Sequence, residues 1–267
     1  MSHSLTNHFV CILLWGLSTL NLLQAEVSSN APPGMASLPG GAYLPLFRND
    51  ADPKEIEVKA FALDIYPVTN AQFLEFVRTN PRWMRSQAKR IFADANYLNH
   101  WAGDLEIGSA TTTNAPVTRI SWFAAKAYAA WAGKRLPTTA EWELAAAASL
   151  TKADGVKDPE FKQQVAAWLS SPSPERLLPV GTGRANYFGV HDLHGLVWEW
   201  VADFNTAMVT GDARSDSGLE RQLFCGSGSA GAKDPGDYLG FMRFGFRSSL
   251  KADYTVHNLG FRCAKDL

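Results

Sequence analysis

Cysteine is scarce in this chain of 267 residues, which has only Cys11, Cys225 and Cys263. The sequence also lacks an HExxH motif, a glycine-rich phosphate loop and a Ser–His–Asp order. It therefore gives no sign of the metalloprotease, nucleotide-binding or triad-hydrolase classes. The six histidines show no spacing that suits a metal, and His191 and His194, three residues apart, come nearest.

An excess of charge of either sign is missing too. The 25 basic and 26 acidic residues leave a formal net charge of -1, so no surface for nucleic acid or an anionic membrane is expected. Hydrophobic residues make up 46% and charged residues 19%, which is typical of a globular chain. Internal repeats and low-complexity tracts are absent from the sequence. The nine tryptophans and 21 glycines predict a loop-rich domain pinned by aromatic side chains.

No charged side chain precedes Glu26. Within this stretch, residues 9–23 form an apolar run with the length of a signal-peptide core, and Ala25 offers a small residue for cleavage. The run is short for a membrane span, which needs about 20 apolar residues. We therefore predict a signal peptide over 1–25, a flexible lead-in over 26–36 and one domain over 37–267. The protein would be periplasmic or secreted, with no membrane attachment after cleavage; the alternatives are an uncleaved anchor and a buried helix.

The first half of the domain has two regular stretches. Residues 61–66 alternate with a period of about two and predict a strand that ends at Pro67. Thr69 or Asn70 can then cap a helix that extends to Val77. Residues 80–113 show no period, so we expect them to be irregular.

A pair of helices follows. Ser121 is suited to cap a helix that Gly133 ends. Thr138 can cap the second, and Glu141 three residues later completes a capping-box pattern. Residues 150–178 are polar and punctuated by Pro and Ser, so they predict a surface insertion with some helix. The pattern as a whole indicates an α+β domain with low regular secondary structure.

Four segments carry a resemblance to a known family. They are Tyr66–Asn70, the stretch from Ala115 through the RLPT and EWE motifs to Glu143, the stretch Gly189–Trp200 that ends in WEW, and Asn258–Cys263, which reads NLGFRC. In this order they resemble the formylglycine-generating enzyme (sulfatase-modifying factor) family over about residues 40–263. The resemblance implies a C-type-lectin-like α+β fold.

The resemblance also implies a metal. In the family a calcium site lies at the segment corresponding to 192–199, and its oxygen ligands suit a hard cation. Carried over, the ligands are the side chains of Asp192 and Glu199 and the carbonyls of Gly195 and Val197. The sequence departs from the family at Leu196, where the family usually has Asn.

A structural role is the alternative for the acidic residues of these motifs. Glu141 and Glu199 sit beside tryptophans and could accept hydrogen bonds from backbone donors in loops. Arg135 and Arg262 could pair with the same carboxylates.

The catalytic cysteines of the family have no counterpart. By resemblance, the active enzymes bind copper(I) with two cysteines that lie between a Gly-Gly-Ser strand and the terminal NLGFRC segment, since soft thiolates suit that metal. Here residues 226–262 contain no cysteine. We therefore expect neither copper nor cysteine-dependent formylglycine generation. Cys225 and Cys263 are either a disulfide, which an oxidising compartment permits, or two buried thiols.

The same interval suggests a binding region. Small residues at 225–231 would let a ligand approach the backbone closely, and the arginines that follow could clamp a carboxylate or phosphate. The candidates for binding a substrate or partner are Tyr238, Arg243, Arg247, Ser248 and Tyr254. The alternative is a glycine-rich strand and turn with surface arginines.

Three functions are compatible with this resemblance. The first is an exported accessory protein that binds a periplasmic protein or peptide partner during maturation, as NirV-type relatives accompany copper nitrite reductase. The second is an oxidative tailoring enzyme that acts on a peptide or siderophore precursor without a cysteine pair. The third is a lectin-like binding module stabilised by calcium. The missing cysteines favour the first and third; a concentrated polar pocket would favour the second, and an exposed aromatic groove the first or third.

Overall fold

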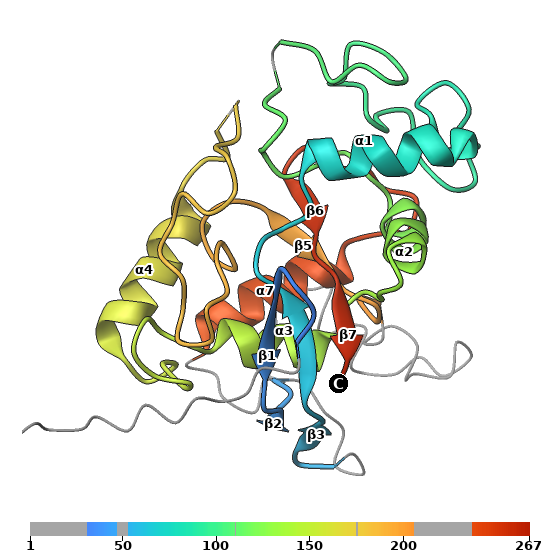
Figure 1. The fold of residues 1–267 in the computed structure, drawn as a ribbon. Helices are drawn as coiled ribbons and strands as arrows, with labels where there is room; N and C mark the ends of the chain where they lie inside the picture. Colours follow the sequence, from blue (N-terminus) through green and yellow to red (C-terminus); the bar gives the residue numbers. More distant parts are fainter. Residues whose placement is uncertain (1–30, 47–52, 110, 175, 206–236) are drawn as a thin grey trace, which may run out of the picture.

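A computed structural model describes residues 31–46, 53–109, 111–174, 176–205 and 237–267. Over these ranges, no helix combines the length and the apolar character needed to cross a membrane. Short helices and strands alternate with long loops, and α1 with its following loops lies at the opposite end from the strands β1 to β3 (Figure 1).

The strands are β1 (Met35–Leu38), β2 (Gly41–Tyr43), β3 (Ile56–Val58), β4 (Phe61–Asp64), β5 (Trp198–Trp200), β6 (Leu259–Phe261) and β7 (Ala264–Asp266). The helices are α1 (Asn70–Thr79), the 3-10 turn η1 (Pro81–Trp83), α2 (Trp122–Trp131), α3 (Thr139–Ala146), α4 (Pro159–Ser170) and α7 (Tyr238–Ser248). This mixed and modest content confirms the predicted α+β class, including the helix expected within residues 150–178 and the irregular stretch after α1.

The sheets join distant parts of the chain. Strand β4 is buried along its whole length and lies between β1 and β7 in an antiparallel sheet, with Leu63 opposite both Ala36 and Ala264. Strands β5 and β6 pair in parallel, so Trp198 lies opposite Leu259. The WEW and NLGFRC motifs are therefore neighbours although about 60 residues separate them.

Three helices begin where the sequence predicts. The Thr69 hydroxyl accepts a hydrogen bond from the Gln72 amide and starts α1, and Ser121 starts α2 in the same way. Thr138 and Glu141 form a complete capping box at α3. Each such cap satisfies amide donors that the helix itself leaves free, and it contributes about 1 kcal/mol.

Buried aromatic side chains hold the loops to the core. Phe73 of α1 stacks on Tyr128 of α2 with centroids 5.8 Å apart, and Phe261 of β6 meets that tyrosine edge-on at 5.3 Å. The buried Trp101 and Trp200 donate their indole N–H groups to an Asn70 oxygen and the Ile120 carbonyl. Burying a tryptophan in this way satisfies its one polar group, which confirms the predicted role of the aromatic residues.

One local prediction is wrong. Short extended pieces are expected from Gly181 to the end of the chain, but Tyr238–Ser248 is the helix α7, which Asp237 caps by accepting from the Gly240 amide at 2.8 Å. Gly240 and Gly245 lower the helix propensity of this segment, but tertiary packing compensates for them. Phe246, for example, stacks on Trp198 with centroids 4.2 Å apart.

Candidate functional site

The glutamate of the WEW motif and the arginine of the NLGFRC segment form a fully buried ion pair. The side chains of Arg262 and Glu199 are both 0% exposed, and two guanidinium nitrogens of Arg262 donate to Glu199 at 2.8–3.0 Å. The Trp142 indole donates to the same carboxylate at 2.7 Å. Arg262 also donates to the carbonyls of Asp64, Ile65 and His191. The pair therefore connects the end of β6 with β4, with β5 and with the loop that contains His191.

The EWE motif has a similar arrangement nearer the surface. Both terminal guanidinium nitrogens of Arg135 donate to Glu141 at 2.7 Å, and Glu141 also accepts from the Thr138 amide. The arginines of these motifs pair with the carboxylates, as the structural alternative has it, and the structure shows which belong together: Arg135 pairs with Glu141 and Arg262 with Glu199.

The implied calcium ligands are already engaged in part. The Glu199 carboxylate is buried against the Arg262 guanidinium. A cation at this carboxylate would have to displace Arg262 and leave the guanidinium charge unpaired. Glu199, as it is placed, therefore does not fit a calcium ion. Asp192 lies in a left-handed conformation with φ of 60° and accepts from the Gly181 amide at 2.5 Å. The calcium site with Asp192, Gly195 and Val197 stays a prediction.

The predicted arginine clamp holds a carboxylate of the protein itself. Arg243 and Arg247, one turn apart on α7, both donate to Glu143 of α3, at 2.8–3.1 Å and 2.5 Å. Burial favours the neutral form of Glu143, but the two guanidinium groups outweigh it and lower its pKa to about 2. Arg247 also lies over the Trp142 ring, 4.7 Å from its centroid. The cluster docks α7 onto α3, close to α4 (Figure 1).

The other three residues of the predicted binding set do not converge. Tyr238 is 62% exposed at the start of α7. Ser248 lies at the end of that helix, and its hydroxyl oxygen is buried without a partner among the described residues. Tyr254 lies in the loop beyond, packed against the core, with the Lys251 ammonium 5.8 Å from its ring.

The thiol chemistry is equally restricted. Cys263 is buried, and its amide donates to the Asp64 carboxylate at 2.9 Å. Burial, followed by the negative charge of Asp64, raises the pKa of the thiol well above its usual value, so the thiolate that copper(I) requires is disfavoured. Cys225 and the small-residue stretch 225–231 lie outside the described residues, so the choice between a Cys225–Cys263 disulfide and two buried thiols stays open.

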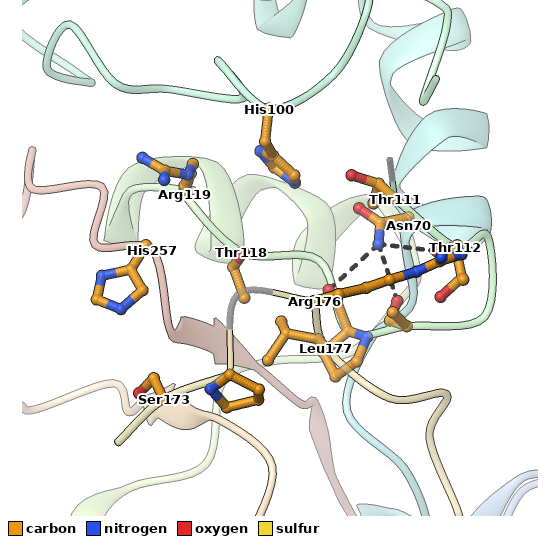
Figure 2. Close-up of a pocket in the computed structure, with 13 residues that line it drawn as sticks. Asn70, His100, Thr111, Thr112, Thr118, Arg119, Ser173, Arg176, Leu177 and His257 are labelled. Carbon is orange, nitrogen blue, oxygen red and sulfur yellow. Dashed lines mark hydrogen bonds between the residues drawn. The ribbon is translucent and has the colours of Figure 1, made fainter. Parts of the chain in front are cut away.

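A polar cleft of about 760 Å³ lies elsewhere, beside the start of α1 (Figure 2). Its wall is formed by residues from five separate segments: Asn70, His100, Thr111, Thr112, Ala115, Pro116, Thr118, Arg119, Ser173, Pro174, Arg176, Leu177 and His257. Arg119 and His257 lie at one end and Arg176 with Asn70 at the other, while His100 hangs over the middle.

The cleft contains none of the predicted binding residues. Asn70 has a structural role in the wall of the cleft, because its amide nitrogen donates to the carbonyls of Thr112, Ala115 and Pro116 and its side-chain oxygen accepts from the Trp101 indole. The sequence carries no local pattern for this site, since the wall assembles from loops between motifs. Its nearest sequence signal is the pair Thr118–Arg119, which lies between the APV and SW motifs together with Ile120.

Comparisons with known proteins identify the relatives of the chain. The family described as "Sulfatase-modifying factor enzyme 1-like domain" matches residues 22–267. The mouse (Mus musculus) protein named Inactive C-alpha-formylglycine-generating enzyme 2 is 31% identical, over 95% of this chain and 91% of that protein. The formylglycine-generating enzyme of Streptomyces coelicolor is 30% identical, over 79% of this chain and 80% of that enzyme.

Solved structures include one of PvdO from Pseudomonas aeruginosa, which aligns with a TM-score of 0.48 and 21% sequence identity. The alignment covers 87% of this chain and 94% of PvdO.

Proposed function

The chain belongs to the sulfatase-modifying factor enzyme 1-like family, and on that premise we propose that it is an exported accessory protein for the maturation of a periplasmic partner, acting without cysteine-dependent formylglycine generation. One observation carries the proposal. The whole interval 226–262, where the active enzymes have their cysteine pair, contains no cysteine. The printed name of the mouse relative, which calls that protein inactive, agrees with this proposal.

The loss of the cysteine chemistry can be tested directly. The purified protein is incubated with copper(I), oxygen and a peptide that carries the cysteine of a sulfatase motif, and mass spectrometry follows conversion of that cysteine to formylglycine. The Streptomyces coelicolor enzyme serves as the positive control. We expect no conversion by this chain. Conversion that disappears in the Cys225→Ser variant would overturn the proposal.

The accessory role needs a cellular test, and the partner class that we favour is a copper nitrite reductase. Co-expression of the chain with such a reductase in a bacterial periplasm should raise the fraction of reductase that holds copper and is active. The Cys225→Ser variant should support maturation equally well, because the role does not use a thiol. An unchanged copper content with and without the chain would count against this partner.

The polar cleft favours a second candidate. A cleft of about 760 Å³ with polar and charged side chains in its wall is large enough for a small molecule or a peptide end. It would suit an oxidative tailoring enzyme acting on a peptide or siderophore precursor. Such an enzyme would need a catalytic group other than a cysteine pair. Turnover of a precursor peptide with consumption of oxygen, measured in the same mass-spectrometric assay, would favour this candidate over the accessory role.

A further inference from the structure

The lining of the polar cleft has cationic but no anionic side chains. The cationic side chains are those of Arg119 and Arg176; His100 and His257 line the cleft as well, and neither Asp nor Glu does. Within the described ranges, no carboxylate lies within 4.0 Å of either arginine in the cleft. The arginines of the cleft differ in this respect from Arg135 and Arg262 of the family motifs, which are both ion-paired. A hollow with positive charge and no counter-charge attracts anions.

Arg119, in the wall of the cleft, has an unusual backbone conformation. Its φ is 53°, in the left-handed region that residues other than glycine rarely adopt. The Arg119 amide donates to the Val256 carbonyl at 3.1 Å, and its own carbonyl accepts from the Leu98 amide at 2.9 Å. Such a conformation costs about 1–2 kcal/mol, and it persists where the surrounding structure enforces it, often at functional sites.

His100 supplies an independent sign of a ligand. Both of its ring nitrogens are buried and have no partner in the described structure, and the same holds for the Thr112 hydroxyl. Burial and then the positive charge of Arg119 lower the pKa of His100 to about 4, so its ring is neutral at pH 7 and carries one N–H donor. A buried polar group without a partner costs about 1–3 kcal/mol, and a bound ligand would recover that cost.

We propose that this cleft binds an oxyanion, a carboxylate or a phosphate, on a small ligand or a peptide end. Arg119 supplies the charged donor at one end of the cleft and Arg176 adds positive charge at the other, while His100 and Thr112 supply neutral donors (Figure 2). A guanidinium group matches both oxyanions because its parallel N–H groups can donate to two oxygens at once. The proposal does not depend on the accessory role, because it rests on the cleft alone.

The test measures binding of two probes, inorganic phosphate and citrate, to the purified protein by isothermal titration calorimetry at constant ionic strength. Saturable binding of at least one is expected, and the stronger probe identifies the oxyanion. Arg119→Asn should weaken binding by a factor of ten or more, since asparagine tolerates the left-handed backbone but lacks the charge. Arg184→Gln, which removes an exposed arginine outside the cleft, should leave binding unchanged.

A second variant separates binding from folding. His100→Phe keeps a ring of similar size but removes both unpartnered nitrogens, so the ligand-free protein should melt at the same temperature or higher. The same variant should bind the stronger probe at least threefold more weakly. Absence of saturable binding by both probes, or equal binding by the wild type, Arg119→Asn and His100→Phe, would overturn the proposal.

Discussion

Replacing Arg262 by methionine should be among the most damaging single changes in this protein. The substitution keeps an unbranched side chain but removes the guanidinium group that faces Glu199, where both side chains are 0% exposed. The Glu199 carboxylate would then be a buried charge with only the Trp142 indole as a donor. Three carbonyl groups, of Asp64, Ile65 and His191, would lose the same donor.

The size of the effect follows from these contacts. Removing one partner of a buried ion pair costs about 3–5 kcal/mol. The Ile65 carbonyl would still accept from the His191 amide, so only the carbonyls of Asp64 and His191 could add about 1 kcal/mol each, and water and local relaxation reduce that sum. A domain usually has only about 5–15 kcal/mol of stability, so the Arg262→Met variant should fold but lose a large part of its stability.

The assay is urea unfolding followed by tryptophan fluorescence, with free energies from linear extrapolation. The matched control is Arg78→Met, which removes an exposed ion pair with Glu75 (side chains 48% and 59% exposed) and should cost less than about 1 kcal/mol. Equal losses for Arg262→Met and Arg78→Met would refute the argument that burial decides the cost.

Two further predictions concern buried histidines and the carboxylate that α7 contacts. Burial and then Arg243 lower the pKa of His194 to about 4, and burial and Arg119 do the same for His100. An unfolded histidine titrates near 6.5, so the unfolded chain binds more protons between pH 6.5 and 4. The free energy of unfolding should therefore fall by about 3 kcal/mol for each histidine as the pH drops through this window. An unchanged urea midpoint between pH 7 and 4.5 would contradict this. Glu143→Gln removes the carboxylate charge that Arg243 and Arg247 of α7 contact, and it should lower the free energy of unfolding by about 2–4 kcal/mol in the same urea assay. A loss of stability below about 0.5 kcal/mol would show that these ion pairs do not stabilise the packing of α7.

Much of the local structure could be predicted because short-range chemistry determines it. The caps at Thr69, Ser121 and Thr138 involve side chains and amides three residues apart, so a sequence pattern is sufficient to identify them. The pairing of Arg262 with Glu199 was also foreseeable, since a buried charge in a tryptophan-rich motif needs a partner of opposite sign.

Long-range packing determined the rest. The α7 segment has two glycines and a weak helical pattern, and its helix depends on contacts with Glu143 and Trp198 that lie far away in the sequence. The same contacts decide that Arg243 and Arg247 bind an internal carboxylate rather than an external one.

By itself the sequence determined the family, the α+β class, the capped helices and the lack of a cysteine between residues 226 and 262, because these properties depend on residue identity and short spacing. Only the tertiary structure decided where the polar cleft lies. Its wall combines loops from five segments. Its positive charge depends on Arg119 and Arg176 having no carboxylate partner among the described residues, and the ring nitrogens of His100 are unpartnered there as well. A local sequence pattern does not predict this, because whether a side chain finds a hydrogen-bond or ion-pair partner depends on contacts between residues that are far apart in the sequence.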